Sequence, residues 1–582
     1  MSARLRDDAR LLVACGIAVV AFGLLARGNA ALLQAGTYVA IFALAAIGLS
    51  ILLGNVNQIS VGQAGFFGIG AYAVAYLTVD VGWPFWSAAL VGVVVAALVG
   101  VLVGIIALRF RGHYLAMATL AFGLIVVGVL HATPALGGAS GITNVPYPQI
   151  GAFTFTGPAA YWGAWFVVLI AAVKVTFILH SRIGRSWEAI RNDELAAEAI
   201  GVPTRAYKVL AFAIAAGLAA AGGAMFSAFL GLVNPEAVGI ALSIDFLLMV
   251  VLGGAGLVAG AVLGAALIGF ANVIGHQWDN WREVVYGAVV IGFVSLAPGG
   301  ILGSLRATFS RRRRGYAAVP QPAAARAPAS ERETAAAGAA ARAHVQAPSA
   351  EPLAVRGVTK RFGGLTAVDD VSFTLTPGTL TSLIGPNGAG KTTLFNAICG
   401  IGHATSGTVT VGGRDAGRLR PHRIAALGVG RTFQNARLFD DMTVLENVAA
   451  AAGGARAMRR ADDTLARLAL THLRDVPAKD LAFGDRRRVE LARAVVPDPW
   501  LLLADEPAAG LNEAERGRLD DDLCALRDAG TTILLIEHDM RLVMAISDRV
   551  IVLNFGRVIA DGDVATVRSD PAVIAAYLGT GA

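Results

Sequence analysis

The chain has 582 residues, of which 55% are hydrophobic and only 15% are charged, and its formal net charge is +7. Together with a mean hydropathy of +0.62, this composition excludes an ordinary soluble enzyme and predicts a large membrane-spanning part. The three cysteines, Cys15, Cys399 and Cys524, lie far apart without C-x-x-C spacing. The sequence therefore predicts neither a disulfide framework nor a zinc site.

The first half of the chain is a succession of apolar runs, and a single transmembrane helix needs about 20 such residues. The expected spans are residues 11–27, 35–53, 62–79, 84–108, 114–131, 159–179, 207–232 and 283–302. One longer run, 243–275, is either one tilted helix or two short helices broken around Gly253, Gly254 and Gly256.

Positive charge predicts the topology, because Lys and Arg accumulate at the cytoplasmic ends of membrane helices. The arginines near the N-terminus and the segment from His180 to Lys208 are expected in the cytosol. The cluster Arg311–Arg314 is interpreted as a cytoplasmic anchor rather than a nucleic-acid patch, so no nucleic-acid partner is expected. The chain returns to the cytosol before this cluster only if the run 243–275 crosses twice, which predicts about ten crossings.

The segment 180–208 differs from the other loops because it is long and carries both signs of charge. It has a helix-forming core from Ser186 to Ile200, followed by stop signals at Gly201 and Pro203. It could be a plain surface helix. Its AAEAIG part, however, resembles the E-A-A-x-x-x-G loop of ABC importer permeases, which implies a coupling segment that docks on an ATPase. The residues carried over from this resemblance are Glu194, Ala196, Ala197, Glu198 and Gly201.

Residues 306–352 are rich in Ala and Pro and have almost no large apolar side chains. Such a stretch cannot bury a core and predicts a flexible tether. It divides the chain into a predicted membrane domain, residues 1–305, and a predicted ATPase domain, residues 353–582.

The ATPase prediction begins with a loop of the form G-x-x-x-x-G-K-T, which lies between the apolar strand LTSLI and a helix. In this setting the backbone N–H groups of the loop wrap a phosphate, Lys391 reaches the β and γ phosphates, and Thr392 can hold Mg²⁺. A Gly-rich turn without a ligand is the alternative. The predicted nucleotide-binding residues of the loop are Gly385, Pro386, Asn387, Gly388, Ala389, Gly390, Lys391, Thr392 and Thr393.

Two further apolar strands end in polar residues. WLLLADEP places Asp505 and Glu506 at the carboxyl end of a buried strand, where α/β proteins form ligand sites. We expect Asp505 to hold Mg²⁺ through water and Glu506 to polarise the water that attacks ATP. TTILLIE leads to His538, which matches the histidine that contacts the γ phosphate in ABC ATPases.

Other segments also resemble ABC ATPase motifs. Gln434, in RTFQNARLFDD, matches the Q-loop residue whose amide reaches Mg²⁺ and the attacking water. Phe362 is similar in position to the aromatic residue that stacks on adenine, although a lone Phe is usually a core residue. Asn512, in AAGLN, corresponds to a D-loop position where many relatives carry Asp.

The segment from Leu481 to Val495 resembles the signature motif, which caps the γ phosphate bound by the opposite subunit. It departs from the common L-S-G-G-Q pattern, because Ala482 replaces Ser, Phe483 replaces Gly and Asp485 replaces Gln, while Gly484 is kept. The ATP site that this motif completes is expected to work, and the missing hydroxyl leaves open whether it hydrolyses ATP at full rate.

The permease part resembles one family in particular, the branched-chain amino acid (Liv-type) ABC importers, and the ending DPAVIAAYLG resembles the ATPase of the same family. The permease segments that carry the resemblance are residues 54–72, 109–123, 137–142 and 243–264. The resemblance implies an all-α polytopic membrane domain followed by an α/β P-loop ABC ATPase domain. It also implies ATP-driven import of branched-chain or other small hydrophobic amino acids across the bacterial inner membrane, with the ATPase in the cytoplasm. Urea or short amides remain open as the substrate.

In this family each ATP lies between the phosphate loop of one subunit and the signature motif of another, so a single chain is incomplete. The implied partners are a second permease and a second ATPase of different sequence, and an extracytoplasmic substrate-binding protein. A homodimer is the lesser alternative. An exporter is one alternative class, but exporters of this layout usually have about six long spans, fewer than this chain is expected to have. A membrane-anchored ATPase without transport is another, and the importer-type coupling segment argues against it.

Overall fold

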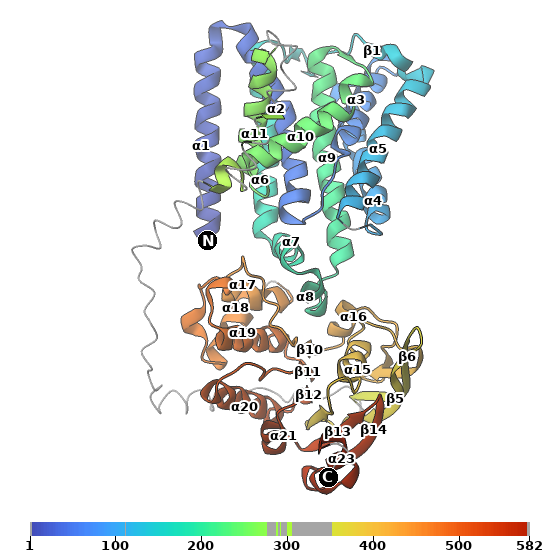
Figure 1. Cartoon of the computed structure of the whole chain (residues 1–582). Coiled ribbons are helices and arrows are strands. Elements are labelled where there is room, and N and C mark those ends of the chain that lie inside the picture. The colour runs from blue at the N-terminus through green and yellow to red at the C-terminus, as the bar shows by residue number, and fades with distance from the viewer. Residues whose placement is uncertain are drawn as a thin grey trace. The chain divides into compact units, whose positions relative to one another are not determined.

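The computed structural model describes residues 3–110, 112–275, 287–288, 292, 299–304, 352–454 and 456–578. The chain forms two compact units (Figure 1). The first comprises residues 1–187 and 205–321, and the second comprises residues 188–204 and 322–582. The predicted linker 306–352 lies outside the described residues, apart from Pro352.

Apolar helices make up most of the described part of the first unit. They are α1 (Ala3–Leu25), α2 (Ala30–Ser50), α3 (Gln63–Val79), α4 (Phe85–Ala107), α5 (His113–Ala132), α6 (Pro158–His180), α9 (Thr204–Leu230), α10 (Ile240–Gly253) and α11 (Val258–Gly275). A π-helical turn, Ile51–Asn55, extends α2, and short strands pair as β1 (Ile142–Thr143) with β4 (Leu232–Val233) and as β2 (Gln149–Ile150) with β3 (Phe153–Thr154).

Seven helices in the described residues are long and apolar enough to cross a membrane, judged by length and composition, and α3 and α11 are shorter apolar helices. They coincide with the spans expected from the sequence up to residue 275. The expected span 283–302 lies almost entirely outside the described residues. The total of ten crossings therefore stays a prediction.

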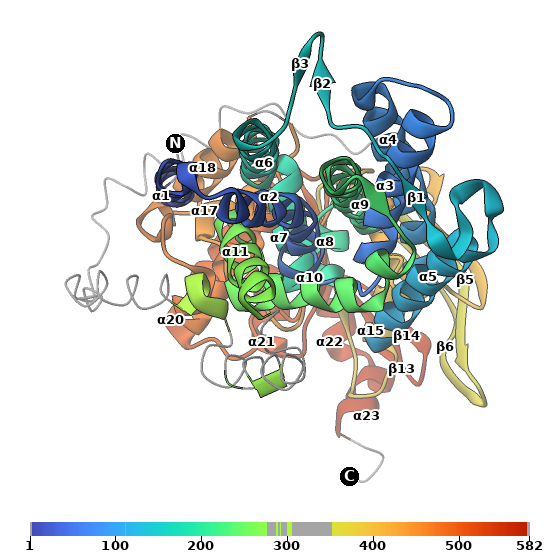
Figure 2. The same cartoon turned by 90° about the horizontal axis from the view of Figure 1, so that it is seen from above.

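Helix α2 lies at the centre of the first unit and packs against α6, α10 and α11 (Figure 2). Its side chains are mostly buried from Leu33 to Ser50. The helix is apolar on every face because it is surrounded by other helices rather than by solvent.

The long apolar run 243–275 is two helices, as one of the two alternatives predicted. Helix α10 ends at Gly253, and α11 begins at Val258 after Gly254 and Gly256, whose φ angles are 118° and 85°. A Cβ atom on Gly54 would lie 1.9 Å from the Gly256 nitrogen. The break is thus a point of close backbone contact that glycine makes possible.

The helices of the first unit approach each other closely at several glycines. A Cβ atom on Gly223 of α9 would lie 1.8 Å from the Phe67 carbonyl oxygen of α3. A Cβ atom on Gly264 of α11 would lie 1.7 Å from the Met249 carbonyl oxygen of α10. These contacts explain the Gly-rich and Ala-rich composition, because small residues let helix backbones pack closely.

In the second unit, six strands form one sheet in the order β10–β11–β12–β7–β13–β14, parallel except for the antiparallel edge strand β14. The strands are β7 (Leu380–Ile384), β10 (Val429–Arg431), β11 (Leu501–Asp505), β12 (Thr532–Ile536), β13 (Arg549–Asn554) and β14 (Arg557–Gly562). A separate antiparallel sheet has the order β6–β5–β8–β9. Its strands are β5 (Leu353–Phe362), β6 (Leu365–Thr374), β8 (Ser406–Val411) and β9 (Arg414–Asp415).

Both faces of the parallel sheet are covered, because successive side chains of its central strands enter different cores. On β11, Leu501 and Leu503 belong to one hydrophobic cluster, and Leu502 and Ala504 belong to another. This arrangement explains why the strand is continuously apolar. Because these strands are parallel, the carboxyl ends of β7, β11 and β12 lie at one edge, where Lys391, Glu506 and His538 follow.

The described part of the second unit also contains helices on either side of its sheets and beside them. They are α8 (Glu194–Ala199), α15 (Lys391–Ile398), α16 (Pro421–Ala425), α17 (Val444–Ala451), α18 (Ala457–Arg467), α19 (Phe483–Val495), α20 (Glu513–Asp528), α21 (Met540–Ile546), α22 (Val564–Ser569) and α23 (Pro571–Leu578). Helices α17, α18 and α19 pack against one another.

One sequence expectation is wrong here. The single helix expected from Ser186 to Ile200 is two helices, α7 (Arg182–Asn192) and α8. Asp193 lies between them in an extended conformation, and its side chain accepts a hydrogen bond from the Ala196 N–H at 3.0 Å. An Asp in this position ends one helix and caps the next.

We predict that Gly223→Ala destabilises the first unit, because the new methyl group requires α3 and α9 to separate at a cost of about 1–3 kcal/mol. Gly128→Ala is the matched control, since a Cβ atom on Gly128 of α5 meets nothing within 4 Å. The measurement is the thermal unfolding temperature in detergent. Equal unfolding temperatures for the two variants would contradict the close contact.

Candidate active site

The phosphate-loop prediction depends on glycines at positions that other residues cannot occupy. Gly385 and Gly390 have φ angles of 154° and 99°. A Cβ atom on Gly385 would lie 2.1 Å from the Leu553 carbonyl oxygen, and one on Gly390 would lie 2.2 Å from the Ala367 carbonyl oxygen. The loop is therefore held against β6 and β13 by contacts that leave no room for a side chain.

Lys391, the first residue of α15, folds back over this loop. Its ammonium group donates hydrogen bonds to the carbonyl oxygens of Gly385 at 2.6 Å and Pro386 at 3.0 Å. Burial lowers the pKa of Lys391, while the carboxylates of Glu506 and Asp505 raise it. The cation is thus held at the mouth of an anion-binding loop, at the N-terminus of a helix.

Asp505 is the last residue of β11 and is only 4% exposed. Burial raises its pKa to about 6, opposed mainly by the positive charge of Arg431. In the described part of the chain, its Oδ1 atom has no hydrogen-bond partner. A buried carboxylate oxygen that lacks a donor fits a site meant for a cation.

Among the described residues there is no group of three or more His, Cys, Asp or Glu side chains that could hold a metal ion. This finding does not conflict with a magnesium site here, because Mg²⁺ is usually bound by one or two carboxylates together with water and substrate phosphates. The predicted oxygen donors are Asp505, Thr392 and the Gln434 amide, which are all of the hard type that Mg²⁺ prefers.

Glu506 lies next to two other predicted catalytic residues, Gln434 and His538. Its Oε2 atom accepts a hydrogen bond from the Gln434 side-chain amide at 3.0 Å and lies 3.7 Å from the Nδ1 atom of His538. The backbone of Glu506 has a φ angle of 44°. An acidic residue in this left-handed region costs free energy, as is common where a side chain is held for function.

The sequence analysis missed Glu537, which lies directly before His538. The side chain is 1% exposed, its Oε1 atom accepts the Ala508 N–H at 2.9 Å, and its Oε2 atom accepts the His538 N–H at 3.1 Å. Glu537 therefore connects the D-loop segment, residues 508–512, to the histidine loop, which is the loop that carries His538. The available signal was an acidic residue directly after a buried parallel strand, the same pattern that identified Asp505 and Glu506.

Asn512 has a clear local role. Its side chain accepts the Glu515 N–H at 2.9 Å, and the Glu515 carboxylate accepts the Asn512 N–H at 3.1 Å. This reciprocal pair is a capping box at the start of α20. The D-loop role predicted for Asn512 stays a prediction.

The signature segment starts helix α19, and Ala482 at its N-cap offers no side-chain cap. Gly484 packs tightly, because a Cβ atom there would lie 2.3 Å from Oε1 of Glu515. Phe483 is half exposed, and its ring lies against the D-loop, 2.9 Å from where a Cβ atom of Gly510 would be. The remaining predicted signature residues, Leu481 and Asp485, flank this helix start.

Phe362 is not a core residue. It is the last residue of β5, its side chain is 55% exposed, and the Lys360 ammonium lies 5.1 Å from the centre of its ring. An exposed ring is available for stacking on a base.

The coupling segment belongs to the second unit, since residues 188–204 cluster with the ATPase domain. The Arg437 guanidinium donates to the Asp193 carboxylate at 2.8 Å, and the Asp441 N–H donates to the Asn192 side chain at 3.4 Å. The sequence alone does not predict that these four residues meet, because each is an ordinary polar residue in its own segment.

The residues predicted for coupling lie in the same segment. Ala196 and Ala197 are buried, and Gly201 has a φ angle of 93°. The Glu198 carboxylate lies 3.9 Å from the His422 ring, and Glu194 begins α8. Helix α8 packs against α16.

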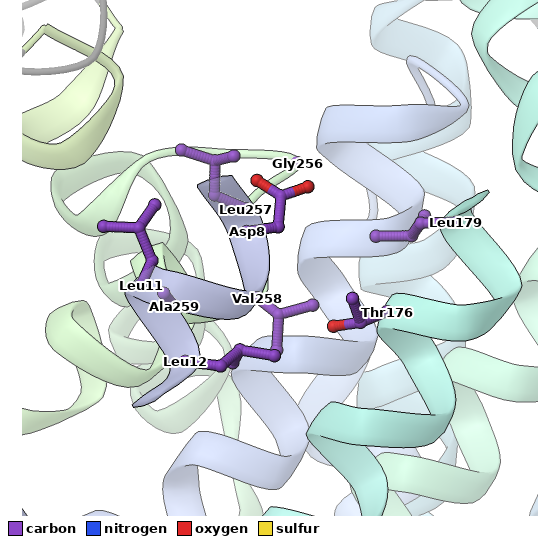
Figure 3. Close-up of a pocket in the computed structure, with 9 residues that line it drawn as sticks. All are labelled: Asp8, Leu11, Leu12, Thr176, Leu179, Gly256, Leu257, Val258 and Ala259. Carbon is purple, nitrogen blue, oxygen red and sulfur yellow. The ribbon is translucent and has the colours of Figure 1, made fainter. Parts of the chain in front are cut away.

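A small cavity lies in the first unit, between α1, α6 and the loop that links α10 to α11 (Figure 3). Its volume is about 20 Å³, which is room for about one water molecule. Asp8 and Thr176 are the polar lining residues, and the others are four leucines, Gly256, Val258 and Ala259. This cavity is too small for an amino acid, so it is not a substrate site.

Comparisons with known proteins define both parts of the chain. Residues 31–294 match the family described as branched-chain amino acid transport system / permease component, and residues 368–509 match the ABC transporter family. Residues 557–582 match the family described as branched-chain amino acid ATP-binding cassette transporter.

Individual relatives cover the ATPase part. The high-affinity branched-chain amino acid transport ATP-binding protein LivG of Salmonella typhimurium is 46% identical over 248 residues, which are 39% of this chain and 97% of LivG. The corresponding protein BraF of Pseudomonas aeruginosa is 43% identical over the same shares. A crystal structure of the ADP conformation of an ATP-binding cassette is 32% identical, with a TM-score of 0.38 over 40% of this chain and all of that one.

An apolar helical domain and a P-loop ATPase with these motifs, joined in one chain, define the class as an ABC transporter subunit that couples ATP hydrolysis to transport. More narrowly, the chain belongs to the branched-chain amino acid ABC transporter family, with permease and ATP-binding parts fused. It binds ATP, and its ATPase domain works on the cytoplasmic side of a membrane. These findings confirm the family, the fold class and the ATPase activity expected from the sequence.

We predict that Gly390→Ala weakens ATP binding at least about tenfold, because the methyl group meets the Ala367 carbonyl and the left-handed backbone adds about 1–3 kcal/mol of strain. Gly402→Ala is the control, since a Cβ atom there meets nothing within 4 Å. The measurement is fluorescence titration with a nucleotide analogue. Unchanged affinity in Gly390→Ala would show that the loop does not bind phosphate in this conformation.

Proposed function

We propose that the chain is the fused permease and ATPase subunit of an importer for branched-chain or other small hydrophobic amino acids in a bacterial inner membrane. The permease comprises residues 1–305, the linker residues 306–352 and the ATPase residues 353–582. The observation that carries the proposal is one chain with a Liv-type permease match over residues 31–294 and an ATPase 46% identical to LivG. Urea or short amides, carried by the same machinery, are the alternative substrates.

ATP would be bound by Phe362 on the base and by the loop from Gly385 to Thr393 on the phosphates. Mg²⁺ would be held by Asp505, Thr392 and Gln434, and it would neutralise charge on the phosphates. The unpartnered Oδ1 atom of Asp505 supports this assignment, because an oxygen that accepts no hydrogen bond from the protein is free to bind a cation or its water.

Hydrolysis is assigned to Glu506, Gln434 and His538. The Glu506 carboxylate would orient and polarise the attacking water, the Gln434 amide would fix its position, and His538 would contact the γ phosphate. The support is that the Gln434 amide lies 3.0 Å and the His538 ring 3.7 Å from the same carboxylate oxygen. All three come from separate segments of the chain.

The assembly we propose adds a second permease, a second ATPase of different sequence and an extracytoplasmic substrate-binding protein, surrounded by membrane lipid. The signature residues Leu481, Ala482, Phe483, Gly484 and Asp485 would face the nucleotide bound by the partner ATPase. Ala482 favours a heteromer. The partner ATPase can then supply a signature motif that keeps the serine hydroxyl, so that one of the two ATP sites is complete. A homodimer would have two weakened sites.

Closure of the ATPase domains would reach the membrane domain through the coupling segment. The contact of Arg437 with Asp193 supports this role, because it joins the segment that contains Gln434 to the segment between α6 and α9. A change at the nucleotide would then be transmitted through two adjacent segments.

We predict that Glu506→Gln abolishes ATP-dependent leucine uptake, because the amide cannot accept the water proton, while Glu513→Gln, an exposed glutamate on α20, leaves uptake unchanged. The measurement compares uptake and efflux of labelled leucine and urea in the native host. Loss of urea uptake with intact leucine uptake would favour the alternative substrates. Unchanged influx with altered efflux would contradict import.

We predict that Arg437→Glu lowers leucine uptake per ATP hydrolysed about fivefold, since replacing attraction by repulsion at a half-exposed pair costs about 1 kcal/mol. The double variant Arg437→Glu with Asp193→Arg should restore the ratio, because the charges are exchanged. Arg518→Glu is the control, since in the described residues the Arg518 side chain donates to the Ala514 carbonyl oxygen of its own helix. Failure of the double variant to recover would contradict a direct charge pair.

A further inference from the structure

The signature helix α19 holds the Q-loop segment, residues 432–439, through one buried arginine. Arg487 is 4% exposed. Its guanidinium donates to the Phe433 carbonyl oxygen at 2.8 Å and, through its other terminal nitrogen, to the Gln434 carbonyl oxygen. A planar guanidinium can engage two consecutive carbonyl groups in this way, and an ammonium group would hold them less rigidly.

The same Gln434 faces the reacting centre with its other end. Its backbone carbonyl accepts from Arg487, and its side-chain amide donates to Glu506 at 3.0 Å. Because the Q-loop segment has no helix or strand of its own, hydrogen bonds from neighbouring elements must fix its backbone. The position of the amide thus depends on the arginine.

A second residue of α19, Glu490, contacts the segment at Arg437. The Glu490 carboxylate accepts the Arg437 N–H at 3.2 Å and lies 3.8 Å from the Arg487 guanidinium. Glu490 is 1% exposed. The ion pair with Arg487 is therefore shielded from solvent. The backbone of Arg437 is tied to the same helix as the carbonyl groups of Phe433 and Gln434.

Arg487 also contacts the start of the signature helix. Its guanidinium carbon lies 5.5 Å from the centre of the Phe483 ring, within the range of a cation–π contact. Phe483 in turn lies against Gly510 of the D-loop segment. A shift of the helix start would move the ring and the guanidinium together.

From this geometry we propose that Arg487 is a positioning residue for ATP hydrolysis, which fixes the Q-loop backbone to the signature helix and so sets the Gln434 amide against Glu506. The proposal rests on the catalytic roles proposed above for Gln434 and Glu506. Its consequence is that engagement of the signature helix with a partner's nucleotide adjusts the hydrolytic residues of this chain's own site. The two ATP sites are thereby linked through one side chain.

The next residue, Arg488, provides a matched control. It is on the same helix and also mostly buried, but its guanidinium donates to the Leu468 carbonyl oxygen at 2.6 Å and to Asp522 at 3.2 Å. These partners lie outside the Q-loop segment. Loss of Arg488 therefore removes a buried arginine from α19 without changing the hydrogen bonds of Gln434.

The test compares Arg487→Gln, Arg487→Lys and Arg488→Gln in the assembled transporter, purified through a tag on this chain. We expect Arg487→Gln to lower kcat for ATP hydrolysis at least tenfold with KM for ATP changed less than threefold, and Arg487→Lys to recover part of the loss. Arg488→Gln should lower kcat less than Arg487→Gln does, even if the unfolding temperatures of the two variants fall equally. Equal kcat losses in the two Gln variants would overturn the proposal.

A readout independent of turnover is hydrogen exchange of the backbone amides. In Arg487→Gln the peptide that contains residues 432–439 should exchange at least tenfold faster without nucleotide, and peptides from β7 and β12 should not change. An unchanged rate in the Q-loop peptide would overturn the proposal, because it would show that Arg487 does not hold this backbone.

A double-mutant cycle separates this proposal from the proposed function. If Arg487 acts through Gln434, Arg487→Gln combined with Gln434→Ala should be no slower than Gln434→Ala alone, whereas multiplied losses would contradict the proposal. Glu506→Gln in the same preparation tests the catalytic assignment. Retained hydrolysis in that variant would refute the proposed function, whatever the outcome for Arg487.

Discussion

The shared contact at one carboxylate oxygen of Glu506 is the interaction on which the ATPase site depends. The Gln434 amide and the His538 ring approach this oxygen from different segments. The negative charge of the same carboxylate raises the pKa of Lys391, against the effect of burial. None of these segments is near another in sequence. They meet because β10, β11, β12 and β7 are adjacent parallel strands whose carboxyl ends lie at one edge of the sheet.

Close backbone approach provides the second constraint, in both units. In the ATPase, Gly385 and Gly390 let the phosphate loop lie against the Leu553 and Ala367 carbonyls. In the helical unit, Gly223 plays the corresponding role between α9 and α3. At these glycines the physical reason is the same, which is contact between backbones at distances that a Cβ atom would prevent.

Polar contacts buried beneath the site connect it to the rest of its unit. Arg487 and Glu490 hold the Q-loop segment from the signature helix, and Glu537 joins the D-loop to the histidine loop. Each is almost fully buried and hydrogen-bonded, as an ionised group inside a protein must be. Movement of a single loop would leave one of these charges without a partner, so the loops are expected to move together.

The sequence by itself determined the family, the order of the two domains, the phosphate loop, and the positions of Asp505, Glu506 and His538 at or just after the carboxyl ends of buried strands, because these depend on residues adjacent along the chain. It also located the helices up to residue 275. Only the tertiary structure decided that Asp193 divides the coupling segment, that Glu537 bridges two loops, and that Arg487 holds Gln434. These contacts join residues far apart in sequence or turn on local backbone geometry, and no periodicity or motif encodes which buried charge will meet which backbone group.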